Sequence, residues 1–446
     1  MTAIAGPAAR SPLHRRTVAA TVVGNFVEYF DWLAYGLFAP LFAAKFFPSS
    51  NPVTSLLGAF AVFAAGMLFR PLGGILLGRL ADRRGRKPAL MVSITMMAAG
   101  STLIGISPTY HQIGLLAPVL LLLARAAQGI SSGGEWPAAV TYLMELAPAN
   151  RQCFYGSLFA MSASMGAFVA ALLGGGLTSW LGPHAMAAWG WRVPFLVGAL
   201  FGVILLLARN RLAETAVFQR EVRARPTRGS LRRVLRWHRR EVLLVALFVA
   251  GLTAVTATWT TVVPAVGQRL APKGMMFWVV VLVTAVVALT QPLLGLLADR
   301  VGARRFLGAL CVWFTVAGPF AYLGMTGSFG NLVFAYGGGI IFVACVTAAL
   351  PKVLAALFPP AVRALGIGLP VGVTTAVVGG VTPWLATYLR ARDASGWFIA
   401  AVVATVLAAW LAIEVATRRL DAAAAGRPVP GARPALAPEA PEAPAA

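Results

Sequence analysis

Residues 78–87 read GRLADRRGRK, and residues 295–305 read GLLADRVGARR. Both stretches contain Gly-x-Leu-Ala-Asp-Arg, and Asp82 and Asp299 are separated by 217 residues. A second pair of related stretches, LAPANR at 146–151 and LFPPAVR at 357–363, follows later in each half. Loops that recur in the same order indicate an internal parallel repeat, so the sequence predicts two similar halves with a path for a small molecule between them.

The segments between these loops are apolar. Hydrophobic residues make up 59% of the 446 residues and charged residues only 11%, whereas a soluble domain carries about 25% charged residues. This composition argues against a large water-soluble enzyme and excludes a disordered chain. Apolar runs long enough to cross a bilayer are expected at about 18–44, 53–78, 89–108, 113–140, 154–178, 191–208, 241–266, 275–298, 306–326, 331–350, 364–389 and 396–416. We therefore predict an all-α membrane protein with twelve transmembrane helices in two six-helix, pseudo-symmetric bundles.

The net charge of +23 has two readings, nucleic-acid binding or membrane topology. An even number of spans puts both termini on one side of the membrane. Of the 37 Lys and Arg residues, 29 then fall on the side of the termini and 5 on the other side. Because basic residues are retained in cytoplasmic loops, this bias predicts cytoplasmic termini and no nucleic-acid partner.

The same pattern divides the chain into five parts. The first apolar run contains Glu28 and Asp31 and has no clear cleavage site, so we interpret it as a retained span and not as a signal peptide. The linker carries 11 arginines and is expected to lie on the membrane surface. The predicted parts are an N-terminal tail (1–17), a first bundle (18–208), a basic cytoplasmic linker (209–240), a second bundle (241–417) and a disordered, Ala/Pro-rich tail (418–446).

The repeated loops combine glycine, aspartate and arginine. Glycine allows helices to approach closely, and an aspartate can cap the N-terminus of a neighbouring helix. We interpret the loops as a latch that joins the two halves in one state and opens in the other. The alternative is that they serve only topology and packing. The predicted gating residues are Gly78, Asp82, Arg83, Gly85, Arg86, Gly295, Asp299, Arg300 and Arg363.

Ionisable residues inside the spans are costly and are therefore functional candidates. In the first span Glu28, Asp31 and Tyr35 have helical spacing and are expected on one face. Two close carboxyl groups do not ionise independently, which suits a group that takes up and releases a proton. Asp31 lies one turn deeper and is the first candidate for proton coupling. The alternative is that the acids pair with an arginine and only hold helices together.

Two arginines also fall inside spans. Arg125 begins a stripe with Gln128, Ser132 and Glu135 on the fourth span, where Glu135 is either a partner of Arg125 or a structural acid. Arg70 either binds a substrate carboxylate through two hydrogen bonds or pairs with Glu28, Asp31 or Glu135.

The second half carries neutral polar candidates instead of charges. Thr253, Thr256 and Thr260 have helical spacing on the seventh span, with Trp259 beside them, and Tyr336 lies on the tenth span. The predicted substrate-binding residues are Arg70, Tyr35, Gln128, Thr256, Trp259 and Tyr336. Packing is the alternative for each residue of the second half.

Several motifs resemble one family. The GxLADRxGRK loop and LLLARAAQG at 121–129 are similar to signatures of the major facilitator superfamily. GNFVEYFDWLAYG at 24–36, RPLGG at 70–74, QGISSGGEW at 128–136 and WGWRVPF at 189–195 resemble its metabolite:proton symporter family. The resemblance implies transport by alternating access and a role in proton movement for Arg125. The sequence departs from the family pattern at Ala213, after the sixth span, and at Arg363-Ala364-Leu365-Gly366, at the start of the eleventh. The second departure puts substrate contacts or gating in the second half in doubt.

We therefore expect proton-coupled uptake of a small organic metabolite, with a carboxylate favoured. A proton-driven exporter of a drug or metabolite is the alternative. No catalytic motif, metal-ligand spacing or nucleotide-binding loop is present, and Cys153, Cys311 and Cys345 form no paired motif. The expected partners are a small-molecule substrate, protons and the lipid bilayer. We expect a monomer in the inner membrane with no metal, no cofactor and the proton gradient as energy source.

Overall fold

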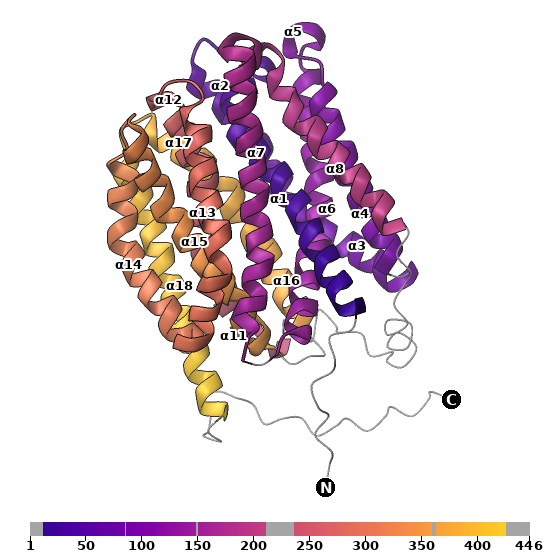
Figure 1. Ribbon diagram of the computed structural model, residues 1–446, viewed down its shortest axis with the longest axis vertical. Coiled ribbons are helices and arrows are strands. Elements are labelled where there is room, and N and C mark those ends of the chain that lie inside the picture. Colours follow the sequence, from indigo (N-terminus) through magenta and orange to yellow (C-terminus); the bar gives the residue numbers. More distant parts are fainter. Residues whose placement is uncertain (1–11, 85, 149, 211–235, 359–362, 425–446) are drawn as a thin grey trace.

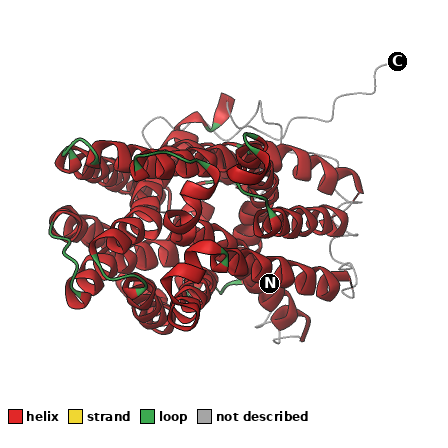
Figure 2. Cartoon of the chain, turned by 90° about the horizontal axis from the view of Figure 1, so that it is seen from above, coloured by secondary structure: helices red, strands yellow, loops and turns green. Residues whose placement is uncertain are grey.

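The computed structural model describes residues 12–84, 86–148, 150–210, 236–358 and 363–424. The side-chain surroundings of Gly78, Asp82, Arg83, Arg86, Glu135 and Arg363 are outside the description, as are Gly85, most of the linker and the ends of the chain. Viewed from above, the described chain is helical, with loops only between helices (Figure 2).

The first half contains six long helices. Two of them are irregular. A break at Phe69 separates α2 from α3, and the backbone of α7 is kinked at Gly182, where φ is 75°. The elements are α1 (Pro12–Phe46), α2 (Pro52–Leu68), α3 (Arg70–Arg84), α4 (Arg86–Ile106), the short α5 (Tyr110–Ile113), α6 (Leu116–Leu146), α7 (Gln152–Ala188), the 3₁₀ turn η1 (Gly190–Arg192) and α8 (Val193–Asn210).

The second half repeats this arrangement. Two of its helices contain a π-helical turn, η2 and η4, a feature that is rare and frequent at functional sites. The elements are α11 (Arg239–Ala257), η2 (Thr258–Val262), α12 (Val263–Leu270), α13 (Met275–Val301), α14 (Ala303–Leu323), α15 (Phe329–Leu357), α16 (Arg363–Thr374), η4 (Thr375–Gly379), α17 (Gly380–Arg390) and α18 (Ser395–Ala424).

Each of the twelve predicted spans corresponds to one helix or one interrupted helix. Ten stretches of the described chain are long and apolar enough to cross a membrane, and Met91–Ile106 in α4 is a shorter apolar helix. The first span, α1, is not among the ten and contains Glu28, Asp31 and Lys45. The predicted fold class is confirmed.

The two halves lie side by side, with α7 of the first half against α13 of the second (Figure 1). Helix α1 begins and α18 ends at the same end of the bundle, which we call the termini end. The other end carries α5 and the loop after α12 and is called the opposite end.

Glycines allow close packing within the first half. A Cβ atom on Gly129 would overlap the carbonyl oxygen of Gly66, and one on Gly133 would overlap that of Arg70. Helices α2 and α3 therefore touch α6 through their backbones, as small residues permit in membrane helices. This contact places the start of α3, with Arg70, against the helix that carries Arg125.

Candidate functional site

A cavity of about 230 Å³ lies between the two halves. Helices α1, α2, α3, α6 and α7 line it from the first half, and α11, η2, α13, α15, α16 and η4 line it from the second. Its walls are largely apolar, as in most small-molecule sites. The polar side chains that line it are Asn25, Glu28, Tyr29, Trp32, Arg70, Ser132, Ser164, Thr253, Thr256, Thr260, Thr261, Thr284, Gln291, Tyr336, Thr347 and Thr375.

The cavity extends from the middle of the bundle toward the termini end, where Leu350 and Pro351 line it. Beyond its other limit the two halves are in contact. The amide of Gln268 donates a hydrogen bond of 2.8 Å to the carbonyl oxygen of Leu37, and the rings of Phe38 and Phe277 lie 5.1 Å apart. These contacts join the halves on the opposite side of the cavity.

One ion pair lies in the wall of the cavity. Nη2 of Arg70 donates to Oε1 of Glu28 at 2.6 Å, and the two side chains are 15% and 2% exposed. Of the alternatives open for Arg70, pairing with Glu28 is therefore present. Because both residues line the cavity, the guanidinium is also within reach of an anionic ligand.

Asp31 lies outside the cavity, on a different side of α1. Its Oδ2 accepts a hydrogen bond of 2.6 Å from the hydroxyl of Ser101 in α4. A Cβ atom on Gly198 in α8 would overlap its Oδ1, so this glycine leaves room for the carboxyl group. Glu28 and Asp31 were expected to act together on one face, but the two carboxyl groups have different neighbours: Glu28 pairs with Arg70 in the cavity wall, whereas Asp31 bonds to Ser101 of α4.

A chain of hydrogen bonds connects Asp31 with Arg125. Nε2 of Gln128 donates to Oγ of Ser101 at 2.8 Å, and Nη1 of Arg125 donates to Oε1 of Gln128 at 2.7 Å. All four side chains are buried. Asp31 and Arg125 are thus linked through two neutral residues and not by a direct ion pair.

Aromatic rings cover the guanidinium of Arg125. Its Cζ lies 3.8 Å from the ring centre of Trp32, 4.5 Å from that of Tyr35 and 5.2 Å from that of Phe63. Cation–π contacts of this kind stabilise a charge by about 0.5 to 2 kcal/mol. They stand in for hydrogen bonds, because Nε and Nη2 have no hydrogen-bond partner among the described residues.

Trp32 separates Arg125 from the cavity. Its indole lines the cavity and its Nε1 donates to Oγ of Ser132 at 2.9 Å. The guanidinium of Arg70 lies 5.4 Å from the same ring. The Trp32 ring therefore contacts one arginine in the cavity and one outside it.

The predicted substrate residues fall into two groups. Arg70, Thr256 and Tyr336 line the cavity. Tyr35, Gln128 and Trp259 are buried elsewhere: the hydroxyl of Tyr35 donates to the carbonyl oxygen of Ala59, and Nε1 of Trp259 donates to that of Ala335. A substrate in this cavity would not touch the last three residues.

Sequence reasoning missed Ser101, Trp32, Asn25 and Gly198. Trp32 and Asn25 belong to the GNFVEYFDWLAYG motif, so the motif itself could have indicated them. Ser101 and Gly198 carry no signal in one sequence, because serine and glycine are common packing residues of membrane helices. Glu135 lies outside the described side chains, and its role stays a prediction.

Asp299 joins the halves at the termini end. Its carboxylate accepts backbone N–H groups of Cys153 and Phe154, both at 3.0 Å, at the start of α7. Nζ of Lys352 in α15 lies 3.4 Å from its Oδ1. A Cβ atom on Gly295 would lie only 2.8 Å from the carbonyl oxygen of Cys153. The capping and the close approach expected of the second loop are therefore present.

The other predicted gating residues are less informative. Arg300 is exposed. Gly78, Asp82, Arg83, Gly85, Arg86 and Arg363 lie outside the described residues or side chains, so the latch in the first half stays a prediction.

Comparison with known proteins decides the family. The model of the Major Facilitator Superfamily matches residues 21–276. The chain belongs to the major facilitator superfamily. The alpha-ketoglutarate permease of Escherichia coli is 37% identical over 87% of this chain and 91% of the relative. The citrate-proton symporter of Salmonella typhi is 32% identical over 86% and 91%, and that of Klebsiella pneumoniae is 34% identical over 82% and 83%.

These relatives confirm the resemblance of this superfamily member to metabolite:proton symporters. They are transport proteins and not enzymes. Among solved structures, a D-xylose-proton symporter superposes with a TM-score of 0.69 over 89% of this chain and 96% of that chain. At 14% sequence identity this likeness concerns the fold alone. It agrees with the two-bundle architecture of the superfamily.

Proposed function

We propose that the chain is a secondary transporter that couples uptake of a small organic carboxylate to proton influx. The relatives named for alpha-ketoglutarate and citrate support this substrate class. A relative named as a putative proline/betaine transporter, 32% identical over 84% of the chain, belongs to the same group. Because the relatives are named for different substrates, the choice of a carboxylate also has to rest on the residues of the site.

The observation that carries the proposal is the ion pair between Arg70 and Glu28 in the wall of the cavity. A substrate carboxylate and the Glu28 carboxylate compete for the same guanidinium. When a proton binds to Glu28, its attraction for Arg70 falls and Arg70 can bind the substrate. Proton and anionic substrate then bind together, which is the requirement for symport.

Asp31 is the second proton site of the proposal. Asp31 is buried, and the chain through Ser101 and Gln128 makes its hydrogen bonding depend on the position of Arg125. Trp32 contacts both Arg125 and the cavity. A substrate that displaces Trp32 would change this chain and with it the proton affinity of Asp31.

Asp299 and its loop act as the latch in the proposal. Asp299 belongs to α13 of the second half and binds the start of α7 in the first half. Rocking of one half against the other, as in alternating access, has to break these hydrogen bonds. We assign the same role to the loop at 78–87.

The direction of transport is tested in proteoliposomes under an imposed inward proton gradient. Radiolabelled alpha-ketoglutarate and citrate serve as probes, with proline and betaine in parallel. Uptake of a carboxylate that collapses when an ionophore removes the gradient supports symport. Gradient-driven efflux instead would support the proton-driven exporter, and a preference for proline or betaine would overturn the assignment to carboxylates.

The proposal also covers the membrane, the oligomeric state and the orientation of the protein. We assign it to the inner membrane as a monomer, with both termini and the linker in the cytoplasm, and with no cofactor besides the proton gradient. Two six-helix domains, 18–208 and 241–417, flank the linker at 209–240. The predicted tails at 1–17 and 418–446 are shorter where the structure describes them, because α1 begins at Pro12 and α18 ends at Ala424. Fusing a reporter that fluoresces only in the cytoplasm to each terminus tests the orientation.

A further inference from the structure

A groove on the outside of the second half lies between α14 and α18 at the termini end. Arg304, Arg305, Gly308, Ala309, Val312, Trp313, Trp410 and Glu414 line it. The two helices approach closely in the groove, since a Cβ atom on Gly308 would lie 3.3 Å from Nε1 of Trp410. The groove is separate from the central cavity and shares no lining residue with it.

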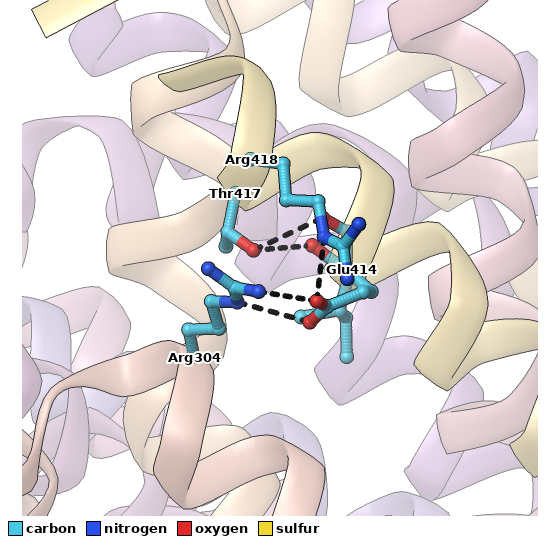
Figure 3. A network of polar contacts seen from close by, with 5 residues as sticks. Arg304, Glu414, Thr417 and Arg418 are labelled. Carbon is cyan, nitrogen blue, oxygen red and sulfur yellow. Dashed lines mark hydrogen bonds and ion pairs between the residues drawn. The ribbon is translucent and has the colours of Figure 1, made fainter. Parts of the chain in front are cut away.

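An ion network holds the charged end of the groove in one arrangement (Figure 3). Glu414 of α18 binds Nε and Nη2 of Arg304 in α14 and Nε of Arg418 one turn further along α18, at 2.8 Å. The network joins the two helices across the groove. Its side chains are partly exposed, with Arg418 at 70%.

The charges of this end do not cancel. Arg304, Arg305 and Arg418 contribute three positive charges, and Glu414 contributes one negative charge. Glu414 is occupied by two arginines, while Arg305 is exposed and makes no ion pair with a described residue. The described side chains at this end of the groove therefore carry net positive charge.

The apolar end of the groove lies on the outer surface of the helix bundle. Val312 and Trp313 are 54% and 42% exposed. Trp313 lies nine residues after Arg304, which is roughly 13 Å along a helix. Arginines at one level and exposed tryptophan and aliphatic side chains about 13 Å deeper match a lipid headgroup followed by its acyl chains.

We propose that this groove, the α14–α18 groove, binds an anionic phospholipid. The phosphate lies against Arg304, Arg305 and Arg418, and one acyl chain lies along Val312 and Trp313. Basic pockets between transmembrane helices on the cytoplasmic side suit such lipids, because anionic headgroups and arginine guanidinium groups form charge-assisted hydrogen bonds. The lipid would hold α14 and α18 together where the ion network already joins them.

The test measures thermal unfolding of the purified protein in detergent during titration with dioleoyl-phosphatidylglycerol, with dioleoyl-phosphatidylcholine as the neutral lipid. We expect phosphatidylglycerol to raise Tm and phosphatidylcholine to have a smaller effect. R305Q and R418Q each lower the apparent affinity for phosphatidylglycerol about five-fold, equivalent to about 1 kcal/mol per arginine near an anionic surface. The matched control is R151Q, which removes an exposed arginine at the same end of the first half.

Equal stabilisation by both lipids overturns the proposal, and so does an equal loss in R151Q, which would mean diffuse attraction. W313L keeps every charge and tests the acyl contact, with lower affinity expected at unchanged Tm in detergent alone. Native mass spectrometry provides a second readout. It should detect phosphatidylglycerol on the monomer and less of it on R305Q, whereas a dimer that R305Q dissociates would assign the groove to a second copy.

Discussion

The guanidinium of Arg125 lies 3.8 Å from the ring centre of Trp32. One face of this indole lies against a buried charge, and the side chain also forms part of the cavity wall. The contact therefore connects a charge that no solute in the cavity can reach with the place where a solute would bind.

Trp32→Leu removes the cation–π contact and the hydrogen bond to Ser132 but keeps an apolar side chain in the wall. We expect proton-driven accumulation to fall about tenfold, in line with the ~0.5–2 kcal/mol of a cation–π contact. Substrate exchange without a gradient should fall less. Parallel flux measurements in proteoliposomes check this, with Trp180→Leu, at an 82% exposed tryptophan, as control. Equal losses in both assays would refute a coupling role.

Asp31→Asn keeps the size of the side chain and an oxygen for the Ser101 hydroxyl, but it cannot take up a proton. We expect proton-driven accumulation to be lost while counterflow exchange persists. Asp393→Asn is the control, because Asp393 is exposed and its φ of 57° is one that asparagine tolerates. Full accumulation by Asp31→Asn would show that the proton is carried elsewhere.

Glu28→Gln removes the competitor for Arg70. Wild-type affinity for a carboxylate should rise as pH falls, because protonation of Glu28 frees the guanidinium. In the variant we expect an affinity that hardly changes with pH and is roughly tenfold higher at alkaline pH, a gain of about 1.4 kcal/mol. Binding is followed by scintillation proximity with radiolabelled alpha-ketoglutarate. Glu241→Gln, at a half-buried acid outside the cavity, should retain the wild-type pH profile, and an unchanged profile in Glu28→Gln would contradict the competition.

Asp299→Asn weakens the cap of α7. A helix cap contributes about 0.5–2 kcal/mol, and the variant destabilises the latched state by this amount. We expect the return to that state, and with it the transport cycle, to slow by about two- to thirty-fold while equilibrium binding is retained. Asp82→Asn should behave in the same way if the first loop is the counterpart of the second. Transport rates and binding constants are compared on the same preparations. Loss of binding in either variant would argue against a latch.

Gly129→Ala forces α6 away from α2, because the new Cβ atom meets the carbonyl oxygen of Gly66. Overpacking of this kind costs about 1–3 kcal/mol, so we expect a lower Tm in detergent. Gly176→Ala is the matched control within a helix, since no atom lies within 4 Å of its Cβ position. It should be neutral or stabilising by up to about 1 kcal/mol.

The fold was predictable from sequence because the bilayer requires long apolar runs and two related loops recur in the same order in each half, the first pair with Asp82 and Asp299 217 residues apart. Charged residues inside those runs are few, so Glu28, Asp31, Arg70 and Arg125 were identified as candidates. Their partners were not predictable. Whether Arg70 pairs with Glu28 or Asp31 depends on the rotation of α1 about its axis and on close glycine contacts such as that of Gly133 with Arg70. The hydropathy of the sequence indicates neither. Trp259 is of a residue type that often binds ligands, yet its indole N–H donates a hydrogen bond to the carbonyl oxygen of Ala335 in α15.

The π-helical turn η2, between α11 and α12, forms part of the cavity wall. An α-helix rotates by about 100° per residue, so adjacent side chains normally face different directions. Within η2, however, Thr260 and Thr261 both line the cavity. Two neighbouring threonines thus lie along one wall, and the hydroxyl of Thr260, which donates to the carbonyl oxygen of Thr256 at 2.7 Å, can still accept a hydrogen bond. Deleting one residue from this turn would restore regular α-helical winding and change which side chains of η2 line the wall, whereas α12 and the hydrogen bond from Gln268 to Leu37 would keep their places, because a π-helical turn accommodates one extra residue within a continuing helix. One extra residue in this helix thus changes the polarity of the cavity wall and leaves the fit of the two halves beyond it unchanged.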